Sequence, residues 1–169
     1  IFLPLIGALG VGLLRSPRAV RWTAFAFSLS AFVISLVLLA WFDSSHGGFQ
    51  FKETYEFLPQ FGVSYDLGLD GISLWMMILT AFLTPLVILG SFETIQKNIP
   101  GYYACLLVLE SALLGTFLAV DLFWFYLFWE LMLIPMFFLI GVWGGERRIY
   151  ATVKFVLFTL VGSFAMLVA

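Results

Sequence analysis

Long uninterrupted runs of apolar residues constrain this chain more than any other feature of its sequence. Residues 22–42 and 72–92 each contain 21 residues without a charged side chain. About 20 apolar residues cross the roughly 30 Å hydrocarbon core of a bilayer as a helix. Three further runs of similar length carry one charge each, at 102–120, 122–143 and 149–169. Residues 1–14 have the composition of the end of another run, so we expect about six membrane helices.

The overall composition agrees with a membrane protein. Hydrophobic residues make up 63% of the chain and charged residues 11%, whereas a soluble domain is about half apolar and about a quarter charged. Only helices and closed barrels satisfy their backbone hydrogen bonds in lipid, and barrel strands alternate in hydrophobicity over about 10 residues. The sequence therefore predicts an all-α fold, a polytopic up-down helix bundle in which residues 1–169 belong to one transmembrane domain. Because the chain begins at Ile1 and ends in an apolar run, we expect it to be part of a longer protein.

The loops between the runs alternate in charge. Acidic residues dominate the loop of residues 43–71, while basic residues occupy the loops on the other side, namely Arg15, Arg18, Arg21, Lys97, Arg147 and Arg148. The positive-inside rule places the basic loops at the cytoplasm or its equivalent and the acidic loop outside. Within the outer loop, residues 64–71 are expected to form a short stretch along the membrane surface.

Glu130 is the residue that most strongly suggests a function. About eight residues of its run precede it and about thirteen follow, so it lies at least about 12 Å from either end of a helix. Ionisable residues at such depth are costly, and they face a bundle interior or a wet cavity. Pro135, five residues later, lacks a backbone donor and clashes with the carbonyl of Leu131, which predicts irregular backbone beside the carboxylate. Glu130 therefore suits a proton pathway, the alternative being a neutral residue that only packs helices together.

Glu110 and Lys154 are the other ionisable residues inside apolar runs. Small residues follow Glu110, including Ser111 and Gly115, so a packing hydrogen bond and a proton-pathway role are both open. Lys154 lies about five residues, or roughly 8 Å, inside its run. A lysine can reach the interface over that distance, and it can also carry protons if it is desolvated.

Other kinds of site have no support in the sequence. The only histidine, His46, lacks ligand partners at metal-binding spacing, and the only cysteine, Cys105, lies in an apolar run. Phosphate-binding and dinucleotide-binding glycine motifs are missing, and the net charge of −2 does not suggest a nucleic-acid partner. We expect the chain to bind no cofactor, metal or nucleic acid itself.

Two stretches resemble a known family. AVDLFWFYLFWELMLIPMFFLIGVWGGERRIYATVKF (119–155) and YDLGLDGISLWMMILTAFLTPLVILGS (65–91) are similar to the antiporter-like subunits of respiratory complex I, the NADH:quinone oxidoreductase, and most similar to their chain M, or subunit 4, group. The resemblance implies a protein of roughly fourteen helices in a bacterial plasma membrane or an equivalent energy-coupling membrane. It also implies that Glu130 is the helix-5 glutamate of a proton half-channel, paired with a lysine beyond Ala169, and that Lys154 has a secondary electrostatic role.

The same resemblance implies which molecules surround the chain. NADH, flavin, iron-sulfur clusters and quinone would be handled by partner subunits, and the membrane neighbours would include other antiporter-like subunits. Two alternatives stay open from the sequence: a subunit of a multi-subunit sodium/proton antiporter, which shares the helix-5 motif, and a passive structural membrane subunit.

Overall fold

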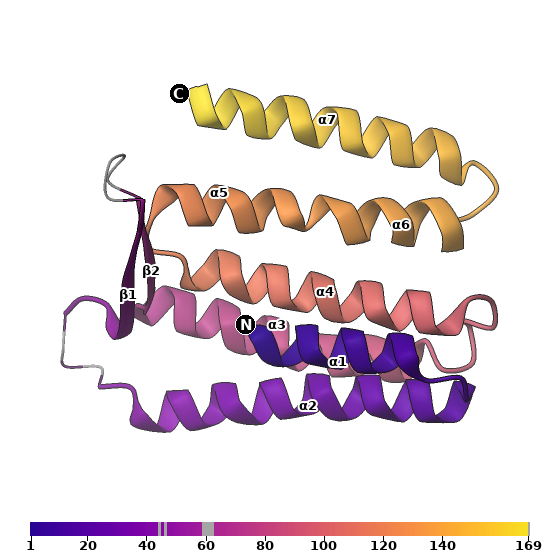
Figure 1. Ribbon diagram of the computed structural model, residues 1–169, viewed down its shortest axis with the longest axis horizontal. Helices are drawn as coiled ribbons and strands as arrows, with labels where there is room; N and C mark the ends of the chain where they lie inside the picture. Colours follow the sequence, from indigo (N-terminus) through magenta and orange to yellow (C-terminus); the bar gives the residue numbers. More distant parts are fainter. Residues whose placement is uncertain (44, 46, 59–62, 169) are drawn as a thin grey trace.

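The computed structural model describes residues 1–43, 45, 47–58 and 63–168. His46, for which the sequence offers no ligand partners at metal-binding spacing, lies outside the described residues. The elements follow one another as α1 (Phe2–Leu13), α2 (Pro17–Trp41), β1 (Gln50–Leu58), β2 (Val63–Leu69), α3 (Gly71–Gly90), α4 (Ile99–Leu118), α5 (Leu122–Leu131), α6 (Leu133–Trp143) and α7 (Arg148–Val168) (Figure 1).

The expected membrane helices are all present. Five helical spans in the described part of the chain are long and apolar enough to cross a bilayer, with α5 and α6 together forming one of them, and α1 is a shorter apolar helix. The all-helical membrane bundle predicted from the apolar runs is confirmed. That residues 1–169 belong to a single domain stays a prediction.

Helix α4 occupies the middle of the bundle. It contacts α1, α2 and α3 on one side and α5 and α6 on the other, while α7 packs on α6, an arrangement that Figure 1 shows as stacked layers from α2 to α7. Close approach of α2 is possible because its buried residues are small or short, namely Val20, Ala24, Ser28, Ala31 and Ser35. Small residues at helix interfaces let backbones approach in membranes, where apolar side chains gain nothing by leaving lipid. The layering puts α4 and α5 side by side at the centre.

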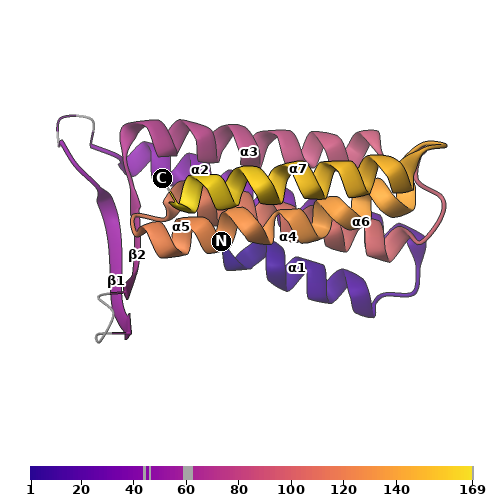
Figure 2. The ribbon, with the colours of Figure 1, turned by 90° about the horizontal axis from the view of Figure 1, so that it is seen from above.

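An antiparallel hairpin of β1 and β2 closes the outer end of the bundle, and Figure 2 shows it running across the helix ends. Most of the stretch at residues 64–71 that was expected to lie along the membrane surface belongs to β2, which pairs with β1 and continues onto the connection between α4 and α5. The backbone N–H of Val120 donates to the carbonyl of Asp66 at 3.0 Å, and Leu67 forms a bridge with Ala119. The fold is therefore helical within the membrane and carries a β-hairpin outside it.

Aspartates define where two helices begin. The Asp70 carboxylate accepts from the backbone N–H groups of Ile72 at 3.1 Å and Ser73 at 2.6 Å, and Asp121 accepts from Phe123 at 2.8 Å. Such N-caps satisfy donors that the first turn of a helix cannot satisfy itself. Both aspartates lie at the outer ends of α3 and α5, so the acidic loops also fix the depth at which those spans start.

Candidate functional site

Glu130 lies in the last turn of α5, immediately before an interruption of the helix. Helix α5 ends at Leu131 and α6 starts at Leu133, with Met132 in between. The irregular backbone predicted from Pro135 is confirmed, since a proline leaves the carbonyl four residues earlier without its donor. Pro85 behaves differently, because α3 continues through it without a break.

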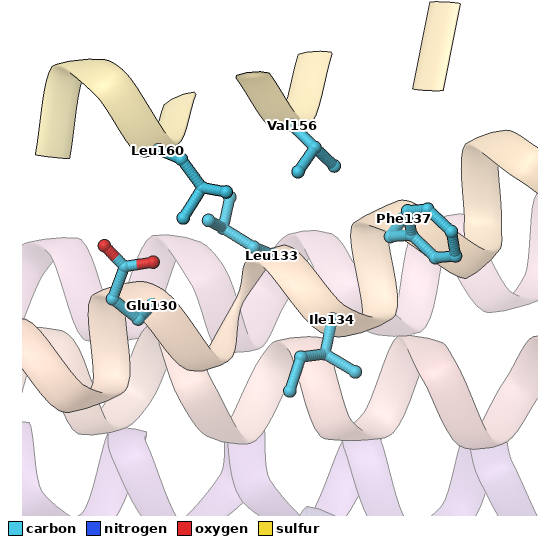
Figure 3. A pocket seen from close by; sticks show the side chains of 6 residues that line it. All are labelled: Glu130, Leu133, Ile134, Phe137, Val156 and Leu160. Atoms are coloured by element: carbon cyan, nitrogen blue, oxygen red, sulfur yellow. The ribbon is translucent and has the colours of Figure 1, made fainter. Parts of the chain in front are cut away.

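The Glu130 carboxylate is half-buried and points toward α7 (Figure 3). The hydroxyl of Ser163 on α7 donates a hydrogen bond to its Oε1 atom. A groove of about 290 Å³ extends from Glu130 along α6 and α7, and its other lining residues are Leu133, Ile134, Phe137, Val156 and Leu160. We call the end of the bundle that carries the basic loops the basic side. Residue numbers on α6 increase toward this side, so the groove runs from the carboxylate toward it.

Glu110 is the most deeply buried charged residue among those described, with 1% of its surface exposed. The Ser28 hydroxyl on α2 donates to its Oε1 atom at 3.2 Å, whereas its Oε2 atom is buried and has no hydrogen-bond partner. A second groove, of about 230 Å³, lies between α3 and α4 and includes Glu110 in its lining.

The two glutamates lie at the same depth in the bundle. Glu110 precedes Leu118, the outer end of α4, by eight residues, and Glu130 follows Leu122, the outer end of α5, by eight residues. Eight residues correspond to about 12 Å of helix. Their grooves open on opposite sides of the α4–α5 pair, one toward α3 and one toward α7, so the two carboxylates have separate surroundings.

A tight contact sets the spacing of α4 and α5. The Phe128 ring packs directly on Gly115, and a Cβ atom added to Gly115 would lie 2.6 Å from ring atoms of Phe128. Phe128 is buried, with 7% of its surface exposed. Only a glycine allows this ring position. The contact lies nearer the outer ends of α4 and α5 than the two glutamates do.

Lys154 is not brought to Glu130. It is exposed on α7, with its ammonium 5.9 Å from the Tyr150 ring centre and 5.8 Å from that of Phe158. Lys154 precedes Ser163, the partner of Glu130, by nine residues, which is about 13 Å along the axis and two and a half turns. The lysine therefore projects from the face of α7 opposite to that of Ser163.

Sequence reasoning missed the serine partners of both glutamates. Ser163 was recoverable, because residues equally far from the connection between two antiparallel helices lie opposite each other, and Glu130 and Ser163 are at comparable distances from Gly145. Ser28 was not recoverable in this way, because α2 and α4 are not consecutive helices.

No cluster of three or more His, Cys, Asp or Glu residues suited to a metal ion occurs in the described ranges. Cys105 is a free, partly exposed thiol on α4. The polar groups of the site are therefore carboxyl and hydroxyl groups, which can hold and pass protons.

Comparison with known proteins gives two family matches. Residues 1–120 match the model described as NADH-ubiquinone oxidoreductase chain 4, amino terminus, and residues 119–169 match the model described as NADH:quinone oxidoreductase/Mrp antiporter, TM. NADH-quinone oxidoreductase subunit M of Rickettsia typhi is 43% identical over 177 residues, which cover all of this chain and 36% of the relative.

Solved structures share the fold. A chain of respiratory complex I from Thermus thermophilus with bound NADH superimposes with a TM-score of 0.83 at 32% identity, covering 99% of this chain and 33% of that one. The Mrp complex from Dietzia sp. DQ12-45-1b gives a TM-score of 0.72 at 24% identity, covering 98% of this chain and 18% of the matched one. The chain spans about a third of the length of the subunit M relative.

Proposed function

Because the chain belongs to the family of NADH-ubiquinone oxidoreductase chain 4, we propose that this integral membrane protein is a proton-translocating subunit of an NADH:quinone oxidoreductase. Its partners in that assignment are other membrane subunits of the complex, including neighbouring antiporter-like subunits. NADH, flavin, iron-sulfur clusters and quinone belong to those partners, and this chain contributes no redox group. The membrane is a bacterial plasma membrane or an equivalent energy-coupling membrane.

The placement of Glu130 carries the proposal. A carboxylate about 12 Å inside a membrane span is costly, so such residues are hydrogen-bonded or take part in transport. Glu130 accepts a hydrogen bond from Ser163 and lies at the outer end of a groove. The backbone carbonyl of Leu131, for which Pro135 supplies no donor, adds a polar group beside it. In this role Glu130 takes up a proton from the groove on the basic side and releases it to a later group, while Ser163 holds the carboxylate in position.

Pumping by the assembled enzyme tests this role. We expect Glu130→Ala to abolish proton translocation coupled to quinone reduction in sealed vesicles, and Glu130→Asp to retain part of it, because the shorter side chain still carries a proton. Glu93→Ala is the matched control, since Glu93 is an exposed glutamate outside the spans. Undiminished pumping by Glu130→Ala would refute the assignment.

A sodium/proton antiporter subunit is the second candidate. The description of the family model that matches residues 119–169 names both NADH:quinone oxidoreductase and the Mrp antiporter. Copurification separates the two, because an oxidoreductase brings flavin and iron-sulfur subunits with it and an antiporter does not. Purified complex without those subunits, catalysing sodium/proton exchange, would favour the antiporter.

A passive structural subunit makes a different prediction for Glu130→Gln. Glutamine keeps the size and the hydrogen-bonding capacity of the side chain, so a purely structural role predicts normal assembly with normal transport. We expect normal assembly without transport.

Glu110 and Lys154 are accessory members of the pathway in this proposal. Glu110 shares the depth of Glu130 and has its own groove, whereas Lys154 acts electrostatically from the opposite face of α7. Substitution of either residue is expected to lower pumping less than Glu130→Ala does.

A further inference from the structure

The groove between α3 and α4 contains polar groups that the pathway through Glu130 does not use. Its lining combines Glu110 with the hydroxyl groups of Thr80 and Thr84 among apolar side chains. The groove extends along α3 to Val87, three residues before Gly90, the end of α3 on the basic side. It therefore extends from the level of Glu110 toward that side of the membrane.

We infer that water fills this groove and gives Glu110 its own proton access from the basic side, separate from the access of Glu130. The inference rests on the proposed function for its purpose, because access matters only if Glu110 exchanges protons during turnover. The presence of water is nevertheless a property of the groove alone.

The unpartnered oxygen of Glu110 argues for an occupant. Oε2 is buried without a hydrogen bond, and a buried polar group left in that state costs about 1–3 kcal/mol. The terminal torsion of a glutamate is soft, so a rotation of the carboxyl group turns Oε2 toward the groove. A hydrogen-bond donor in the groove that reaches Oε2 removes this free-energy cost.

The threonine hydroxyls indicate that this occupant is water. Thr80 donates its hydroxyl hydrogen to the carbonyl of Met76 at 3.0 Å, and Thr84 donates to that of Thr80 at 2.9 Å. Both oxygens are thereby left as acceptors, which suit a protonated Glu110 but not an ionised one. Water both donates and accepts, so it serves both states. A volume of about 230 Å³ leaves room for water at the polar part of the lining, where Glu110, Thr80 and Thr84 supply hydrogen-bond partners.

Thiol labelling tests the inference in the assembled enzyme without turnover. After Cys105→Ala removes the one thiol of residues 1–169, Val87→Cys and Leu86→Cys are compared in vesicles that expose the basic side to a membrane-impermeant thiol reagent, and label is counted on the fragment that contains the introduced cysteine. The two positions are adjacent on α3 and equally exposed, at 48% each, but only Val87 lines the groove. Reaction requires the thiolate, which forms where water reaches, so we expect roughly tenfold or faster labelling at Val87. Equal rates at the two positions would overturn the inference.

Infrared spectroscopy provides a second test at the carboxyl group itself. A band assigned to protonated Glu110 by its loss in Glu110→Gln should shift in deuterated buffer, and Thr80→Val with Thr84→Val should slow or shift that response. Thr159→Val is the control, because Thr159 makes the same type of hydrogen bond on α7 away from the groove. A Glu110 band that does not exchange refutes water access. Rapid labelling and exchange together with normal pumping by Glu130→Ala would instead leave the groove assignment standing and refute the proposed function.

Discussion

Replacing Gly115 by alanine should push α4 and α5 apart. The added methyl group would lie 2.6 Å from ring atoms of Phe128, a distance at which one of the two must move. Phe128 is buried, and it is also in ring contact with Trp124, so its ring has little room to retreat. The substitution therefore acts on the helix pair that carries both glutamates.

The magnitude follows from comparison with a glycine in open space. Alanine is favoured over glycine in a helix by about 0.5–1 kcal/mol, and Gly162 on α7 has nothing within 4 Å of an added Cβ atom. Gly162→Ala should therefore be neutral or slightly stabilising. Gly115→Ala gains the same helical preference but loses about 1–3 kcal/mol to overpacking, so the free energies of unfolding of the two variants should differ by that amount.

Unfolding of the purified protein in detergent measures the difference, and a second substitution tests its cause. Phe128→Leu makes room for the methyl group, so the double variant Gly115→Ala/Phe128→Leu should be destabilised by less than the sum of the two single changes. Proton pumping should fall in Gly115→Ala and recover in part in the double variant. Equal stability of the Gly115→Ala and Gly162→Ala variants, or strict additivity with Phe128→Leu, would refute the reasoning.

Three further outcomes are expected. A hydrogen bond from the backbone of Ser73 lowers the pKa of the Asp70 carboxyl below its ordinary 3.8. The stabilisation of α3 by this cap is therefore complete at neutral pH and is lost as the pH falls through the lowered pKa. In unfolding measured against pH, Asp70→Ala should lose about 1 kcal/mol of unfolding free energy at neutral pH and less in acid, whereas Asp70→Asn should stay close to wild type. A double-mutant cycle of Glu130→Gln and Ser163→Ala, read by unfolding in bicelles, should give a coupling of about 0.6–1.7 kcal/mol, and a value near zero would argue against their hydrogen bond. Lys154→Gln should reduce vesicle pumping less than Glu130→Ala, because the lysine projects from the opposite face of α7 to that of Ser163, and an equal loss would contradict that geometry.

The membrane helices could be predicted from the sequence because lipid leaves few choices. An apolar run of about 20 residues can satisfy its backbone only as a helix, so length and charge alone located α2, α3, α4 and α7. The hairpin was different. Strand β1 contains charged residues such as Lys52 and Glu53, and its partner and the helix connection behind it are set by tertiary contacts that no local pattern displays.

The position of Glu130 along its span could be predicted, whereas the contacts between helices that are not consecutive could not. Depth depends only on counting along one helix, and the irregular backbone followed from Pro135. Pro85 shows the limit of that argument, because the same residue type leaves α3 continuous. A proline removes one donor in either helix, so the residue type alone does not determine whether the preceding turn stays regular. That Lys154 faces away from Glu130 likewise depends on which side of α7 packs on α6.

The interruption at Met132 divides one membrane span into two mechanically different halves. The outer half, α5, is held at its start by the Asp121 cap and by the hydrogen bond between Val120, which precedes that cap, and the hairpin. Phe128 packs it tightly on α4. The inner half, α6, packs on α7 as well as α4. Met132 itself keeps helical bonds to Phe128 and Met136, so the two halves differ in what holds them rather than in direction, and the donor missing at Pro135 makes their junction the weakest turn of the span.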